Sequence, residues 1–179
     1  ALALEQKGFV AAAERNGQKL DGFTLGNSPY DYINTDLKDK QVAITTTNGT
    51  RCLHLSYEAG EIIIGSFLNL NAIANFCKKK QRDVIAFCSG WKDKFNLEDT
   101  LFAGALANAL SDTFTIECDS TLAAIDLYHT AKPDLSGYIK KASHAQRFER
   151  LGIDKDIEFC MQQSIYDFVP KMVGDDLVL

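Results

Sequence analysis

Short apolar runs alternate with amphipathic stretches between residues 9 and 110 of the chain. The apolar runs predict strands, and the amphipathic stretches predict helices. The expected strands are 9–13, 41–46, 61–65 and 83–88, and the expected helices are 50–58, 71–80 and 97–110. Parallel strands need long crossover connections, which are usually helices. We therefore predict an α/β fold, a three-layer sandwich whose mostly parallel or mixed sheet is covered by helices.

The remainder of the chain is mostly helical in pattern and ends in a hairpin. Helices are expected at 120–130, 135–141, 145–151 and 154–163, and the hairpin strands at 169–173 and 177–179. No repeat or linker divides the chain, so we expect a single domain over residues 1–179. A short helical segment at 1–7 leads directly into the first strand, whereas such a helix normally follows an earlier strand. We therefore expect a domain truncated at its N-terminus.

Composition excludes several classes of protein. The chain is 46% hydrophobic and 24% charged, which is typical of a globular domain. Its apolar runs are far shorter than the roughly 20 residues that a membrane helix needs. Because the net charge is -5, we expect no nucleic-acid partner and no membrane partner. The five cysteines do not have the paired spacing of a metal or redox site, and they predict a reduced, cytoplasmic protein. The sequence leaves open whether the protein forms a homo-oligomer.

Residues 45–51, Thr-Thr-Thr-Asn-Gly-Thr-Arg, lie between an expected strand and an expected helix. Ligands of α/β proteins bind beyond the carboxyl ends of strands, and a helix N-terminus attracts anions. Asn48, Gly49, Thr50 and Arg51 are therefore candidate contacts to an anionic substrate, with Arg51 supplying a permanent charge. The simpler alternative is a capped turn in which Thr50 is the N-cap residue.

Other polar turns occupy comparable places along the chain. Asn27 lies in the turn 26–29, Ser66 and Asn69 follow the third expected strand, and residues 88–91 follow the fourth. If the strands are parallel, these loops gather at one edge of the sheet. Asn27, Ser66 and Asn69 are therefore further candidates for substrate binding.

Two charged pairs could supply catalytic or metal-binding carboxylates. Glu98 and Asp99 open the helix expected at 97–110, after Asn96 as its N-cap, and Asp99 could complete a capping box. Acidic residues in a first helical turn also simply favour the helix dipole. Alternatively they hold Mg²⁺, which commonly takes one or two carboxylates plus water and substrate oxygens. Glu14 and Arg15, after the first strand, form a second such pair.

His144 is the histidine that we consider as a catalytic residue, because it could donate a proton to a leaving oxygen. Most histidines in such a position are simply solvated. The candidate catalytic residues are thus Glu98, Asp99 and His144. The glycine-rich nucleotide fingerprints are absent, and Lys94 stands where a cysteine phosphatase needs an arginine after Cys88. No cluster of histidine and cysteine in the sequence indicates zinc.

The order and number of these motifs resemble the 2-phosphosulfolactate phosphatase family over essentially the whole chain. The segments that carry the resemblance are 14–17, 22–29, 45–51, 65–69, 88–90, 95–100, 103–105, 143–152 and 156–160.

The resemblance implies Mg²⁺-dependent hydrolysis of 2-phosphosulfolactate to sulfolactate and phosphate, a step of coenzyme M biosynthesis. It implies a small anionic substrate carrying phosphate and sulfonate, with a metal-activated water attacking phosphorus. By motif position, Glu14, Glu98 and Asp99 are the expected Mg²⁺ ligands. Arg15, Asn27, Asn48, Gly49, Thr50, Arg51, Ser66 and Asn69 are the expected substrate contacts.

One departure from the family pattern keeps two alternatives open. The family's N-terminal strand, with its Asp-x-x-Arg-Ala type motif, has no counterpart in this sequence. The chain could therefore be a phosphatase for another small phosphomonoester, or an anion-binding module without catalysis.

Overall fold

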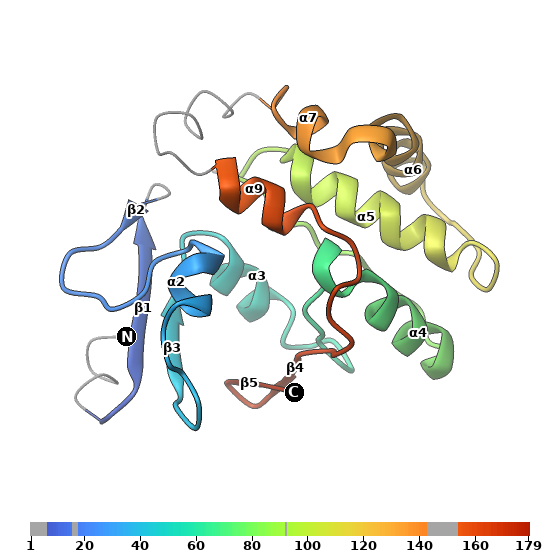
Figure 1. The fold of residues 1–179 in the computed structure, drawn as a ribbon. Helices are drawn as coiled ribbons and strands as arrows, with labels where there is room; N and C mark the ends of the chain where they lie inside the picture. Colours follow the sequence, from blue (N-terminus) through green and yellow to red (C-terminus); the bar gives the residue numbers. More distant parts are fainter. Residues whose placement is uncertain (1–6, 16–17, 92, 143–153) are drawn as a thin grey trace.

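The computed structural model describes residues 7–15, 18–91, 93–142 and 154–179 (Figure 1). The strands are β1 (Val10–Arg15), β2 (Gln18–Lys19), β3 (Val42–Thr45), β4 (Lys171–Val173) and β5 (Asp176–Val178). The α-helices are α2 (Pro29–Ile33), α3 (Gly49–Leu55), α4 (Leu70–Lys80), α5 (Leu97–Leu110), α6 (Asp119–Ala131), α7 (Leu135–Ile139) and α9 (Asp154–Cys160). Two short 3₁₀ helices, η1 (Phe67–Asn69) and η2 (Lys132–Asp134), precede α4 and α7.

The larger sheet is mixed and has the strand order β2-β1-β3. β1 pairs in parallel with β3, from Val10 opposite Val42 to Ala13 opposite Thr45, and antiparallel with β2. Ala11, Ala12 and Ala13 are almost fully buried, as expected for the small apolar residues of a central strand. The predicted strands at 9–13 and 41–46 are confirmed, and so is the α/β class.

The predicted strands at 61–65 and 83–88 are wrong. Residues 61–65 make only an isolated bridge, between Ile63 and Lys171. Residues 83–88 have no regular secondary structure, and their apolar side chains are open to solvent, with Ile85 90% exposed. A strand needs a neighbour for its backbone hydrogen bonds, and no described segment pairs with 83–88. An apolar run indicates strand propensity but does not identify that neighbour.

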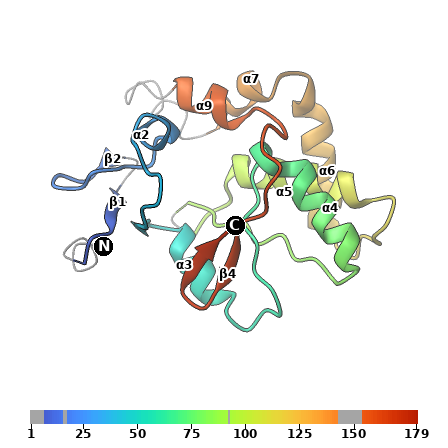
Figure 2. The same ribbon diagram turned by 60° about the horizontal axis from the view of Figure 1, so that its bottom comes forward.

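The main hydrophobic core lies between the helices α4, α5, α6 and α7, on the side of the molecule opposite the β1–β3 sheet (Figures 1 and 2). Buried Ile73, Leu101 and Ile139 belong to this core. At Gly104 of α5 an added Cβ would lie 2.0 Å from the carbonyl oxygen of Ala124 on α6. Only glycine therefore permits this close approach of α5 to α6. The predicted helix at 97–110 is confirmed at both ends, and the helices predicted at 71–80, 120–130 and 135–141 are also present.

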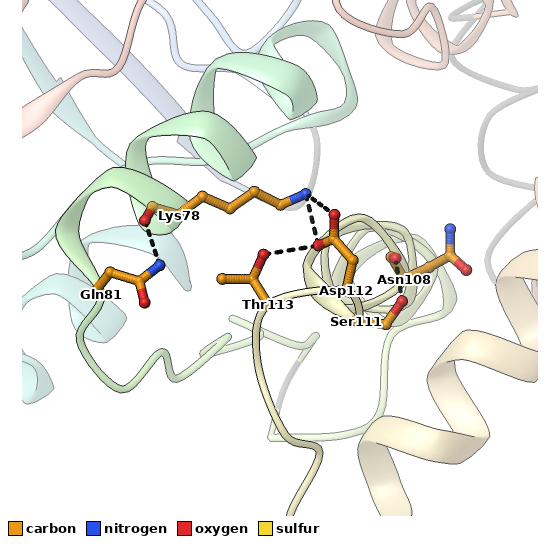
Figure 3. Close-up of polar contacts among 6 residues, drawn as sticks. All are labelled: Lys78, Gln81, Asn108, Ser111, Asp112 and Thr113. Carbon is orange, nitrogen blue, oxygen red and sulfur yellow. Dashed lines mark hydrogen bonds and ion pairs between the residues drawn. The ribbon is translucent and has the colours of Figure 1, made fainter.

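An ion pair ties α4 to the turn after α5. The Nζ atom of Lys78 lies 2.8 and 2.9 Å from the two carboxylate oxygens of Asp112 (Figure 3). Thr113 donates a further hydrogen bond to this carboxylate. The charged partner and both hydrogen bonds lower the pKa of Asp112 below its ordinary value. The Lys78 carbonyl accepts from the side-chain Nε2 of Gln81, the residue that ends α4 in the left-handed conformation.

The C-terminal segment runs back along residues 62–69. The Ser164 amide donates to the Phe67 carbonyl, and the Tyr166 amide donates to the Leu68 carbonyl. The chain then closes in the β4–β5 hairpin, with Lys171 opposite Val178, which confirms the predicted terminal hairpin. The helix predicted at 154–163 is shorter, and those predicted at 1–7 and 145–151 lie outside the described residues. None of the helices in the described ranges is long and apolar enough to cross a membrane.

Candidate functional site

A cavity of about 1920 Å³ lies between the sheet and the helices, and residues at the carboxyl ends of β1 and β3 are among those that line it. The sequence-predicted site residues that it brings together are Glu14, Asn27, Gly49, Thr50, Ser66, Glu98 and Asp99. Asn48 and Arg51 line a smaller cavity of about 350 Å³. Arg15, at the exposed end of β1, and Asn69 line neither cavity. His144 lies outside the described residues.

The turn that carries Asn27 is held from several sides. The Gly26 amide donates to the Asp31 carboxylate at 2.7 Å, and the Gly26 carbonyl accepts from the Tyr32 hydroxyl at 3.1 Å. The Ser28 hydroxyl donates to Asp156 of α9 at 3.0 Å and also caps α2. These contacts fix the position of Asn27 at the edge of the large cavity without using its side chain.

Asp156 is a cavity-lining residue that the site prediction missed. Its carboxylate meets Ser28 across 128 positions of sequence. Glu98 from α5 and Asp156 from α9 lie close enough to the thiol of Cys160 to influence its ionisation. Burial is the largest cause, and the two carboxylates add to it, so that the pKa of Cys160 rises to about 11. The position of Asp156 in the family-like segment 156–160 was the available signal.

The loop between β3 and α3 is stabilised by its own threonines. The Thr46 hydroxyl oxygen accepts from the Thr50 amide at 3.2 Å, and the Thr50 hydroxyl donates to the Thr46 carbonyl at 3.0 Å. The helix begins at Gly49 with Asn48 as its N-cap, so the expectation of Thr50 in that role is wrong. The Asn48 side chain makes no capping hydrogen bond, because Thr46 supplies the acceptor instead.

The two neighbouring carboxylates at the start of α5 have different surroundings. Asn96 is the N-cap, as predicted, and its amide group also donates to Glu98 at 3.2 Å. Asp99 does not complete a capping box with Asn96. Its Oδ2 atom instead accepts from the Gly90 amide at 2.7 Å and from the Ser89 hydroxyl at 3.4 Å. Asp99 therefore joins the loop 88–90 to the first turn of α5.

Asn69 is buried, and its amide group is bonded to the surrounding backbone. Its oxygen accepts from the Ser66 amide at 2.8 Å, and its nitrogen lies 3.2 Å from the carbonyl oxygens of Ile64 and Phe168. It therefore ties the loop before α4 to the C-terminal segment. Ser66 remains exposed and lines the large cavity.

The thiols near Asp99 also respond to the charge of the site. Cys88 is exposed as a whole, but the protein around its thiol removes part of the thiol's hydration, and this raises the pKa of Cys88, with the Asp99 carboxylate and Cys52 adding to the effect. The pKa of Cys52 is raised by burial and by Asp99, and the positive charge of Arg51 opposes this. Arg51 itself forms an ion pair with Asp93, and both side chains are largely exposed.

The donors around the large cavity are carboxylates, hydroxyls and amides, which suit a hard cation and an oxyanion. Within the described ranges, no three side chains of histidine, cysteine, aspartate or glutamate form a ready metal cluster. The donor set therefore fits an ion that completes its shell with water and substrate oxygens.

The fold and this cavity define an α/β protein with a cavity beside its sheet that carboxylate, hydroxyl and amide side chains line in part. The chain belongs to the 2-phosphosulpholactate phosphatase family, whose sequence model matches residues 1–175. The resemblance drawn from the motifs is thereby confirmed, and the family is one of phosphatase enzymes.

Several relatives are described as probable 2-phosphosulfolactate phosphatases. The protein from Caldanaerobacter subterraneus subsp. tengcongensis is 39% identical over 165 residues, which cover 92% of this chain and 68% of that protein. The protein from Thermotoga maritima is 37% identical over 180 residues, with 100% of this chain and 77% of that protein covered. The protein from Picosynechococcus sp. is 37% identical, covering 93% and 70% respectively.

Proposed function

We propose that this protein hydrolyses 2-phosphosulfolactate to sulfolactate and inorganic phosphate. Family membership supports the reaction, since the relatives carry the corresponding description. The observation that carries the proposal is that Glu14, Asn27, Ser66 and Glu98, from separate elements, line the same large cavity.

We propose Mg²⁺ as the cofactor, with one or two of the expected carboxylates Glu14, Glu98 and Asp99 as its protein ligands, since the three do not form one cluster in the described residues. Carboxylate donors suit this ion, which usually keeps several waters and binds substrate phosphate. Asp99 already accepts from Gly90 and Ser89 through Oδ2, which leaves its second oxygen for the ion. When bound, Mg²⁺ supplies positive charge to the phosphoryl group and activates water.

The chain's own polar groups would bind and orient the substrate. Asn27 and Ser66 offer uncharged donors around the large cavity, and Arg51 offers a charged donor beside it. The uncharged donors would hold the phosphoryl oxygens in place, and the positive charge of Arg51 would attract the anionic substrate to the site. We assign the protonation of the leaving hydroxyl oxygen to His144.

We place the reaction in coenzyme M biosynthesis or sulfolactate metabolism, in the cytoplasm. The compartment is supported by the cysteines, all five of which are free thiols.

The test is release of inorganic phosphate from 2-phosphosulfolactate by the purified protein, with Mg²⁺ and with excess chelator. We expect phosphate release with Mg²⁺ and none with chelator. 2-Phospholactate and 3-phosphoglycerate serve as comparison substrates of similar size. Faster hydrolysis of either would assign the protein to another phosphomonoester. Binding of phosphate without any turnover would indicate an anion-binding module instead.

A further inference from the structure

The smaller cavity adjoins the larger one, because Cys88, Ser89 and Asn96 line both. Among the described residues that line the smaller cavity, Arg51 and Lys94 carry positive charge and Asp93 carries negative charge. A cavity of about 350 Å³ lies within the size range of sites that hold small organic ligands, which begins at roughly 300 Å³. The smaller cavity is thus a partly open space that two cationic residues help to line.

Lys94 is held at this wall by a tight turn. The Trp91 amide donates to the Lys94 carbonyl at 3.0 Å, and the Lys94 amide donates to the Trp91 carbonyl at 3.1 Å. Gly90, at φ +66°, leaves no room for a side chain, since an added Cβ would lie 2.7 Å from the Lys94 carbonyl oxygen. The bond from Gly90 to Asp99 anchors this turn on α5. In the part of the chain that the structure describes, the Lys94 ammonium group has no ion-pair partner.

Arg51 forms an ion pair with a carboxylate, and the anionic group of a ligand could take the place of that carboxylate. Its guanidinium Nη1 bonds Asp93 Oδ1, and the two side chains are 64% and 77% exposed. An exposed ion pair of this kind contributes little to stability, because water screens both charges. A ligand that offers several anionic oxygens to Arg51 and Lys94 together would displace Asp93 at little cost.

We propose that this cavity binds the sulfonate group of the substrate, the anionic group that is not transferred. The inference rests on the proposed function and extends it to substrate specificity. A sulfonate has three acceptor oxygens, and three of the residues that line this cavity carry side-chain donors for them: Arg51, Lys94 and Asn48, whose side chain makes no capping hydrogen bond. Because the two cavities adjoin at Ser89 and Asn96, the phosphoryl group of the same molecule would lie toward Glu98 and Asp99.

This arrangement would favour binding of the sulfonated acid over analogues that have no sulfonate group. A substrate without the sulfonate would displace Asp93 without replacing its charge, or would leave Arg51 paired and Lys94 unused. A site built to pair a charged group discriminates strongly against an analogue that lacks it. Arg51 and Lys94 would then act mainly on substrate binding and little on the transfer of the phosphoryl group.

Isothermal titration calorimetry with sulfolactate, the product, tests the binding step without requiring turnover. Lys94→Gln removes one cation, and we expect it to weaken sulfolactate binding by about 10-fold. Asp93→Asn removes the competing carboxylate, so we expect it to tighten binding. Lys79→Gln, an exposed lysine on α4 outside both cavities, is the matched control and should bind as the wild type does. Circular dichroism confirms that each variant is folded.

Kinetics distinguish the sulfonate from the phosphoryl group as the ligand. We expect Lys94→Gln to raise KM for 2-phosphosulfolactate and to leave KM for 2-phospholactate unchanged. Unchanged sulfolactate affinity in both Lys94→Gln and Asp93→Asn, or no binding by the wild type, would overturn the inference. An equal loss of affinity for inorganic phosphate in Lys94→Gln would also overturn it, because the cavity would then hold the phosphoryl group. Sulfolactate binding without hydrolysis would refute only the proposed reaction.

Discussion

The backbone amide of Gly90 donates a 2.7 Å hydrogen bond to the Oδ2 atom of Asp99. This bond joins the first turn of α5 to the loop that lines both cavities. It separates the roles of two adjacent carboxylates, since Glu98 contacts Asn96 within its own helix end, whereas Asp99 reaches a loop nine residues earlier. A change at Asp99 should therefore affect both the stability of the loop and the chemistry of the site.

Asp99→Ala and Asp99→Asn separate these two effects. The alanine leaves the Gly90 amide without its acceptor, and we expect a loss of about 1–3 kcal/mol in the free energy of unfolding. The asparagine keeps an acceptor oxygen and should recover most of that loss. Both variants should need more Mg²⁺ for half-maximal activity, because neither retains the carboxylate. Urea unfolding and Mg²⁺ titration measure the two quantities. If asparagine restores both, Asp99 is an anchor for the loop and not a metal ligand.

Gly90→Ala should destabilise the protein more than Gly174→Ala. Both glycines have positive φ, +66° and +62°, so both substitutions carry the cost of a left-handed backbone, about 1 kcal/mol. At Gly174 the added Cβ would enter open space, whereas at Gly90 it would meet the Lys94 carbonyl oxygen. We expect Gly90→Ala to cost about 1–3 kcal/mol more, by analogy with overpacking. Equal urea midpoints for the two variants would show that the turn after Gly90 adapts without cost.

Asn69→Ala should act through folding. The substitution leaves the Ile64 and Phe168 carbonyls and the Ser66 amide without this partner, so we expect a loss of about 3 kcal/mol. Asn75→Ala, at an exposed position of α4, is the control and should change stability by less than about 0.5 kcal/mol. Thermal unfolding measures both. A stable Asn69→Ala variant with a raised KM would instead place Asn69 in the substrate site, as the sequence predicted.

The helices could be predicted from the sequence because their signals are local. The apolar face of α4, the Asn96 cap of α5 and the pattern of α6 each lie within the element that they define. The strands at 61–65 and 83–88 were not predictable in the same way. Whether an apolar run pairs depends on a neighbour elsewhere in the chain, and the run itself contains no information on that neighbour.

The candidate site could likewise be predicted where its signals are local, and not where it depends on contacts between distant parts of the chain. Its loops could be predicted from their positions after expected strands, and Asn27, Gly49, Ser66 and Glu98 do line one cavity. The bond between Ser28 and Asp156 spans 128 positions, so no local pattern could reveal it. The partner of Arg51 was likewise unpredictable, since Asp93 lies in a turn that the sequence does not relate to α3.

Cys118 should be the most reactive thiol of the protein toward iodoacetamide. Hydrogen bonds with Ser120 and Thr121 lower the pKa of this exposed cysteine, so a larger fraction is thiolate at pH 7–8, and the thiolate is the form that reacts. Burial is the largest cause of the raised pKa values of Cys52, Cys77 and Cys160, and partial loss of hydration beside the Asp99 carboxylate raises the pKa of the exposed Cys88, so these thiols stay protonated. Raising the pH through the ordinary thiol pKa should therefore increase their labelling more than that of Cys118.

Peptide mass spectrometry after brief alkylation measures the labelling of each cysteine. Cys118→Ser should remove the fast phase, and Cys88→Ser should retain it. Cys88 is exposed like Cys118, so equally fast labelling of Cys88 would mean that the raised pKa of its thiol beside Asp99 does not control its reactivity.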